Sequence, residues 1–251
     1  MSPLEQPSEP LFPSEQLSSS KQQQPICIAI TGASGVQYGL TLTQTLVSMN
    51  IPVYLMISQA ARVVIATETE LKLPGSCQQQ ADYLSLYFDT PSHLLKVFNK
   101  TQWLTPPASG SGKWQAMVIC PCSTGTLSAV AQGASNNLIE RAADVALKER
   151  KPLILVPREA PYSRVHLDNM LKITDAGGII LPASPGFYHQ PQTIDDLIRF
   201  MVARILNLLH IDHQLLPEWG ESDRNSVTVR PISEEEAIGD KANPQHKIQN
   251  R

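Results

Sequence analysis

Residues 26–35 read ICIAITGASG: five apolar residues, a threonine, and then a short turn between two glycines. A continuous apolar run of this length is typical of a parallel β-strand that is buried on both faces. The turn at 32–35 follows at once, and a helical pattern begins at Val36. A strand, a glycine turn and a helix in this order predict the first unit of an α/β sheet.

The same alternation continues along the chain. Four more apolar runs predict strands, at 53–57, 117–120, 153–156 and 179–181. Helical patterns occur at 36–49, 59–68, 125–133, 138–148 and 193–209, with Ser58 and Thr193 as the predicted N-caps of two of these helices. We therefore predict a single α/β domain with a doubly wound, Rossmann-like, mostly parallel sheet and helices on both faces.

Both ends of the chain lack the apolar residues that a packed core requires. Residues 1–24 are rich in proline, serine and glutamine, and residues 221–251 show neither a strand period nor a helix period. We expect both ends to be disordered and the folded domain to span residues 25–220. Within it, residues 73–114 hold four prolines and a Ser-Gly run, which predict an irregular excursion from the sheet.

Composition argues against several classes of protein. The 251 residues include 20 Lys and Arg against 23 Asp and Glu, a net charge of −3, which lacks the basic excess of nucleic-acid-binding proteins. No apolar run reaches the roughly 18 residues of a membrane-spanning helix, and the first residues do not resemble a secretory signal. Four cysteines in a chain of this length argue against a disulfide scaffold, and none has the C-x-x-C spacing of zinc or thioredoxin-like sites. A reducing, cytoplasmic setting fits this usage best. We expect Cys120 and Cys122 to be small buried apolar groups.

Hydroxyl side chains follow three of the predicted strands. Ser34 lies in the first glycine turn, Ser58 follows the second strand, and Ser123, Thr124 and Thr126 follow the third. Taken singly, such residues often only cap helices. Because the carboxyl ends of parallel strands share one edge of the sheet, and ligands bind there, together they predict a site for a phosphorylated ligand such as a mononucleotide.

Charged residues are further candidates, each with an ordinary alternative. Arg158 and Glu159 follow the fourth strand, where they either bind a phosphate and exchange a proton or form a solvated pair. Arg141, Asp144 and Lys148 share one helical face, which is usually only a polar surface. The six histidines show no paired metal-ligand spacing, so we predict no metal site.

Seven stretches, spread over residues 26–220, carry a family resemblance. They are ITGASGVQYGL (30–40), ISQAARVVIATE (57–68), PCSTGTLSAVAQG (121–133), NNLIERAADVALKERKPLILVPREAP (136–161), HLDNML (166–171), PGFYHQPQTIDDLIRFMVARIL (185–206) and LPEWG (216–220). With them the chain resembles the flavin prenyltransferase family of the UbiX type, and more loosely the wider group of flavin-binding cysteine decarboxylases. The resemblance implies transfer of the dimethylallyl group of dimethylallyl phosphate to N5 and C6 of reduced FMN. The product, prenylated FMN, would serve a separate UbiD-type decarboxylase.

The resemblance also implies roles for residues. Those expected to hold FMN are Gly32, Ala33, Ser34, Ser58, Ser123, Thr124, Gly125, Thr126 and Arg141. Those expected to bind the substrate are Lys148, Arg158, Tyr188 and Arg204 at the allylic phosphate and Trp219 over the dimethylallyl group. Glu68 and Glu159 would lie beside the reacting centre, with Ser34 near N5. One stretch departs from the family, because residues 122–126 read CSTGT where many members read CSMKT.

These roles agree with the chemistry. Breaking an allylic C–O bond leaves a carbocation and a phosphate, so three converging cations would stabilise the leaving anion without a metal. The flavin, Tyr188 and Trp219 would give the carbocation a dry aromatic wall. The proton lost at C6 goes either to Glu159 or to the released phosphate, and the sequence does not choose between them.

Two other functions would share the fold. A decarboxylase of cysteine-containing substrates is expected to carry a P-x-M-N-x-x-M-W clamp, which is absent, and a catalytic histidine, for which His93 is the sole candidate. A non-catalytic flavin-binding protein would not need the expected phosphate-binding cations. Relatives assemble as dodecamers built from trimers with sites at subunit contacts, so the resemblance implies a homo-oligomer of this kind.

Overall fold

The computed structural model describes residues 23–216. The predicted C-terminal tail and almost all of the predicted N-terminal extension lie outside this range, as does Trp219. Of the described residues, 23–213 belong to one compact unit, and the description below concerns that unit.

The centre of this unit is a six-stranded sheet in the order β3-β2-β1-β4-β5-β6, with every neighbouring pair parallel. The strands are β1 (Ile26–Ile30), β2 (Val53–Ile57), β3 (Leu95–Phe98), β4 (Ala116–Cys122), β5 (Leu153–Pro157) and β6 (Ile179–Ile180). The order reverses between β1 and β4, and ligands of open α/β sheets bind at such a switch point. The predicted fold class is confirmed.

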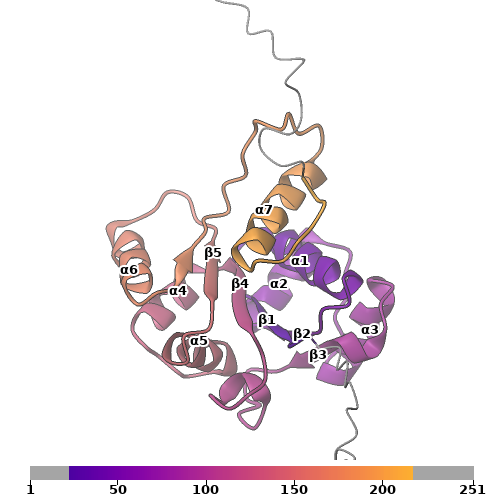
Figure 1. The fold of residues 1–251 in the computed structure, drawn as a ribbon, viewed down its shortest axis with the longest axis horizontal. Helices are drawn as coiled ribbons and strands as arrows, with labels where there is room; N and C mark the ends of the chain where they lie inside the picture. Colours follow the sequence, from indigo (N-terminus) through magenta and orange to yellow (C-terminus); the bar gives the residue numbers. More distant parts are fainter. Residues whose placement is uncertain (1–22, 217–251) are drawn as a thin grey trace, which may run out of the picture. The chain divides into compact units, whose positions relative to one another are not determined.

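Helices cover both faces of the sheet (Figure 1). On one side lie α1 (Val36–Ser48), α2 (Gln59–Glu68) and α7 (Ile194–Leu208), and on the other lie α4 (Thr124–Ala131), α5 (Leu138–Lys148) and α6 (Arg164–Asp175). Alternate residues of the central strands point into the second layer, where Cys27, Met117, Ile119, Leu153 and Leu155 pack against apolar residues of α4 and α5. The strands are buried on both faces, as their continuous apolar runs predict.

Helix ends follow the predicted capping. The Ser58 hydroxyl accepts from the Ala61 amide at the start of α2, and Thr193 forms a capping box with Asp196 at the start of α7. Both N-caps predicted from the sequence are confirmed.

The prediction of an irregular excursion at residues 73–114 is wrong. This stretch contains α3 (Cys77–Tyr87), the edge strand β3 and two short 3-10 turns, η1 (Ser92–Leu94) and η2 (Pro106–Ala108). The glutamine-rich helix α3 gives a weak apolar pattern because it buries a polar side chain, Gln80, beside Ala81 and Leu84. Helix α6 was also not predicted, since three of its five large apolar side chains, Val165, Leu167 and Leu171, are exposed.

Candidate functional site

The turn between β1 and α1 is shaped by its glycines. Gly35 has a φ of 93°, a left-handed conformation that favours glycine, and it forms the N-cap of α1. A Cβ on Gly32 would lie 2.4 Å from the Cβ of Ala60, so a side chain there would push α2 away. Ser34, between the two, is exposed at the carboxyl edge of the sheet. The turn therefore presents the Ser34 hydroxyl on a fixed backbone.

A single residue, Thr31, connects this turn to β4, the neighbouring strand in the sheet. The Thr31 hydroxyl donates to the Pro121 carbonyl at 2.9 Å and accepts from the Ser123 amide at 2.8 Å. The Ser123 hydroxyl in turn contacts the Thr126 hydroxyl at 3.0 Å. The first and third groups of predicted hydroxyls thus lie together at the switch point between β1 and β4.

Ser58 belongs to the same edge. Its amide donates to the Ile30 carbonyl at the end of β1, at 3.0 Å. Its hydroxyl caps α2, so the ordinary role foreseen for such a serine is present in the structure. Space near Gly125 is open, with no atom within 4 Å of a Cβ placed there. The CSTGT stretch, residues 122–126, therefore leaves open space at the start of α4.

Glu68 links α2 to the glycine turn. One carboxylate oxygen accepts from the amides of Gly35 at 2.9 Å and Val36 at 3.3 Å. These amides form the N-terminus of α1, where negative charge is stabilised by the helix dipole. The predicted carboxylate therefore does lie beside the turn that carries Ser34.

Arg158 directly follows β5 and reaches the same edge. Its Nε is buried and has no hydrogen-bond partner among the described residues. Its charge acts on Tyr38 of α1: burial raises the pKa of that phenol, Cys120 adds to the rise, and Arg158 opposes it. An unpartnered buried guanidinium nitrogen is costly unless a ligand accepts from it. Glu159 lies next to it, with Oε1 accepting from the Ala160 amide at 3.1 Å.

Lys148 lies at the opposite edge of the sheet. It ends α5, pairs with Glu149, and lies beside Gly110 in the segment that leads into β4. The length of β5 alone places the amino and carboxyl edges of the sheet roughly 15 Å apart. Within one copy of the chain, the structure therefore does not bring Lys148 to Arg158.

Arg141 is also directed away from the glycine turn. Its Nε donates to the Ala108 carbonyl at 3.1 Å and its Nη1 pairs with Asp144 at 2.7 Å. Arg141 and Lys148 thus share the α5 face that borders residues 108–110. Within one copy of the chain, Arg141 and Lys148 therefore lie apart from the expected site residues at the carboxyl ends of the strands.

Two further expected residues, Tyr188 and Arg204, lie near or on α7. Tyr188 is 53% exposed, and its ring meets Phe200 edge-on at 5.5 Å between centroids. Arg204 is exposed on α7, which packs against α1. Trp219 is outside the described residues, so its predicted place stays a prediction.

The cysteines are all free. Cys27, Cys120 and Cys122 are buried, and burial raises the pKa of each thiol far above its ordinary value. The expectation that Cys120 and Cys122 act as buried apolar groups is confirmed. Within residues 23–216, no group of three or more His, Cys, Asp or Glu side chains is arranged to hold a metal ion. None of the helices in that range is long and apolar enough to cross a membrane.

Comparison with known proteins identifies the family. A family model described as Flavoprotein matches residues 14–206. The flavin prenyltransferase UbiX of Pseudomonas aeruginosa is 59% identical over 196 residues, which cover 78% of this chain and 94% of that protein. The chain belongs to the UbiX flavin prenyltransferase family. It is therefore an FMN-dependent prenyltransferase, as predicted.

Two solved structures of UbiX-type proteins share the fold. AnUbiX (PadA1), solved in complex with FMN and dimethylallyl pyrophosphate, is 35% identical with a TM-score of 0.71, over 80% of this chain and all of that one. The dodecameric FMN-dependent UbiX-like decarboxylase from Escherichia coli O157:H7 is 34% identical with a TM-score of 0.66, over 75% of this chain and 96% of that one.

One feature near the strand ends was missed from the sequence. A cavity opens between α2, α3 and the residues after β3. Because residues 73–114 were expected to be irregular, nothing predicted a cavity there. The Ser76 N-cap before a helix of eleven residues was the available signal.

Proposed function

We propose that this UbiX family member transfers the dimethylallyl group of dimethylallyl phosphate to N5 and C6 of reduced FMN. The observation that carries the proposal for this chain is Arg158 at the carboxyl edge of the sheet, whose buried Nε has no hydrogen-bond partner within residues 23–216. A phosphate oxygen would satisfy this nitrogen and keep the cation buried. The relative AnUbiX was solved with FMN and an allylic pyrophosphate together, which supports the same ligand pair here.

The strand-end residues fit a flavin phosphate and ring. The turn at 32–35 and the hydroxyls of Ser58, Ser123 and Thr126 offer hydrogen bonds at one edge, and Gly125 leaves open space there. We assign FMN to Gly32, Ala33, Ser34, Ser58, Ser123, Thr124, Gly125 and Thr126, with Arg141 from another copy. Reduced FMN supplies the nitrogen and carbon nucleophiles of the reaction.

The chain's own charged side chains would stabilise the leaving phosphate and accept the proton that C6 loses. Arg158 stabilises the developing phosphate anion, with Arg204 and Tyr188 as further contacts. Glu68, held by the α1 amides, keeps a negative charge near the reacting centre, which favours a carbocation. Glu159, or the phosphate itself, takes the proton from C6.

Lys148 and Arg141 reach this centre only from a second subunit. They share a face of α5 that is separated from Arg158 by the length of β5. We therefore propose that the protein is a homo-oligomer whose sites are shared between copies. The dodecameric E. coli relative supports this proposal. We further propose a cytoplasmic enzyme, which the free cysteines fit, that supplies prenylated FMN to a UbiD-type decarboxylase.

Mass spectrometry of the flavin tests the activity. The full chain is incubated without oxygen with reduced FMN and either dimethylallyl phosphate or dimethylallyl pyrophosphate. We expect a flavin heavier by one C5 unit with the monophosphate. Tight FMN binding with unchanged flavin mass in both reactions would contradict the proposal and favour a flavin carrier.

A further inference from the structure

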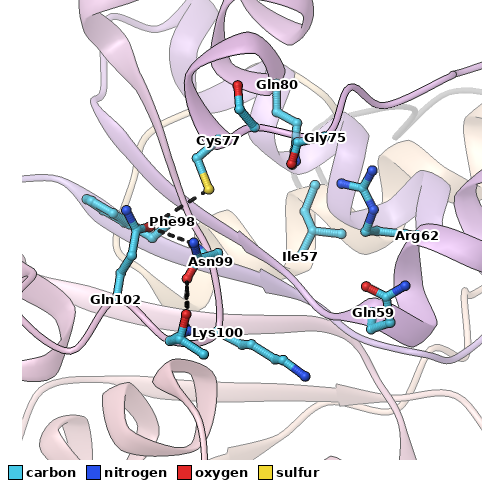
Figure 2. Close-up of a pocket in the computed structure, with 12 residues that line it drawn as sticks. Ile57, Gln59, Arg62, Gly75, Cys77, Gln80, Phe98, Asn99, Lys100 and Gln102 are labelled. Atoms are coloured by element: carbon cyan, nitrogen blue, oxygen red, sulfur yellow. Dashed lines mark hydrogen bonds between the residues drawn. The ribbon is translucent and has the colours of Figure 1, made fainter.

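The cavity between α2, α3 and the residues after β3 lies next to the carboxyl edge of the sheet and has a volume of about 650 Å³ (Figure 2). It lies between the first turns of α2 and α3 and the residues that follow β3. Twelve residues line it: Ile57, Gln59, Arg62, Gly75, Ser76, Cys77, Gln80, Phe98, Asn99, Lys100, Thr101 and Gln102. None of them is expected to hold the flavin or the allylic phosphate, although Ile57 and Gln59 flank Ser58.

The charges of this cavity are all positive. Arg62 and Lys100 are its cations, and no Asp or Glu is among the lining residues. Over residues 23–216, neither cation forms an ion pair. The Arg62 Nη2 donates to the carbonyls of Leu73 and Pro74, both at 3.0 Å, which fixes the guanidinium and leaves its other N–H groups for a ligand. Two cations without a carboxylate favour an anion.

Neutral polar groups complete the lining. Gln80 is 5% exposed, and its Nε2 donates to the Pro74 carbonyl at 3.0 Å, while its Oε1 has no partner in the described part of the chain. Figure 2 shows Gln59 and Arg62 on one side and Asn99 and Gln102 on the other. Ser58 and Ser76 cap α2 and α3, so the positive ends of both helices border the cavity.

We propose that this cavity binds a small organic phosphate, at a site separate from the flavin. Arg62 and Lys100 come from different elements, and a tetrahedral phosphate accepts hydrogen bonds from several directions at once. Ile57 and Phe98 provide an apolar wall for the organic part. The Gln80 carbonyl oxygen provides an acceptor for a ligand hydroxyl. The volume lies within the range of small-molecule sites.

Cys77 reports on this cavity. It lines the wall, with its Sγ 3.8 Å from Gln102 Oε1, whereas Cys27, Cys120 and Cys122 are buried. The experiment alkylates the full chain, already loaded with FMN, with iodoacetamide and follows the Cys77 peptide by mass. Glycerol 3-phosphate should slow labelling, by about tenfold at ten times its dissociation constant. Succinate at equal concentration should protect weakly or not at all.

Variants make the test specific. Lys100→Met should abolish the protection, Lys100→Arg should keep it, and Lys96→Met, on the exposed side of β3, should leave it unchanged. In direct titration calorimetry of FMN-loaded protein, glycerol 3-phosphate should bind wild type and Lys96→Met but not Lys100→Met.

Three results would overturn the proposal. They are complete protection of Cys77 by FMN alone, which would place the cavity within the flavin site; equal protection by succinate; and calorimetric binding that Lys100→Met does not weaken. None of these measurements requires prenyl transfer, so the outcome is independent of the proposed enzyme activity.

Discussion

Thr31 shows how one side chain joins the two halves of the sheet. It is 1% exposed, and its hydroxyl bonds the Pro121 carbonyl and the Ser123 amide at the switch point. Sequence alone placed a threonine at the end of a strand without indicating a partner, because the partner is some 90 residues away. The bond fixes the position of Ser123 at the start of α4.

Replacing Thr31 by valine should keep the side-chain shape and lose both bonds. The Ser123 amide would then lack its partner, and we expect unfolding in urea to show a loss of about 2 kcal/mol. Thr45→Val is the matched control, because Thr45 bonds only within α1, to Thr41. Equal midpoints for the two variants would contradict the role of Thr31.

At the scale of elements, the parts of the fold that are easiest to predict are those with continuous apolar runs. Strands β1 and β2 match their predicted bounds to the residue, because burial on both faces requires apolar residues throughout. Strand β3 was missed because it is a four-residue edge strand with Lys96 exposed. Helix α5 was predicted correctly, but its direction along the sheet, which carries Lys148 away from Arg158, depends on long-range packing.

Gly39 determines how closely α1 packs on β4. A Cβ there would lie 2.1 Å from the Cys120 carbonyl oxygen, so Gly39→Ala must displace the helix. We expect a cost of about 3 kcal/mol in urea unfolding. Gly125→Ala, where no atom lies within 4 Å, should change stability far less. A Gly39→Ala variant as stable as Gly125→Ala would show that the contact relaxes at no cost.

The start of α7 should show a pH dependence. A hydrogen bond with the Thr193 side chain, and then those from the Thr193 and Gln192 amides, lower the pKa of Asp196 below its ordinary value of 3.8. A lowered carboxylate pKa stabilises the folded state above the unfolded pKa and loses this effect as pH falls through the folded one. Asp196→Asn should therefore melt at a lower temperature than wild type at pH 7, with a gap that closes below about pH 4.

Asp195→Asn is the control for this pH dependence. Asp195 pairs with Arg199 on the exposed side of the same helix and does not bond the capping amides. A gap for Asp196→Asn that stays constant from pH 7 to pH 3, or one that Asp195→Asn reproduces, would contradict the capping role.

At the scale of the whole molecule, the residues of the proposed site do not all come together in one copy of the chain. The strand-end edge holds Ser34, Glu68, Arg158 and Glu159, whereas Lys148 and Arg141 occupy a face of α5 beyond the other end of β5. Family motifs identify these residues as a set but contain no distances. The proposed sharing between subunits is inferred from this separation, and it can be tested by mixing subunits.

Lys148→Ala and Arg158→Ala should each be inactive alone and regain activity when co-expressed. In mixed oligomers, about a quarter of the sites would pair the wild-type Arg158 of one subunit with the wild-type Lys148 of its neighbour. Arg158→Ala with Glu159→Gln is the control, because both residues come from one subunit and no site would be intact. Recovery in the control, or none in the first mixture, would refute a site shared in this way.

The central claim is that Arg158 binds the allylic phosphate at the carboxyl edge of the sheet and stabilises it as the C–O bond ionises next to the flavin. The most direct measurement compares phosphate release and C5-flavin formation by wild type and Arg158→Gln, with FMN binding measured beside them. We predict equal amounts of phosphate and C5-flavin from wild type, and a rate lower by about 10²-fold or more for Arg158→Gln with FMN still bound. An Arg158→Gln enzyme that forms C5-flavin at the wild-type rate would contradict the account.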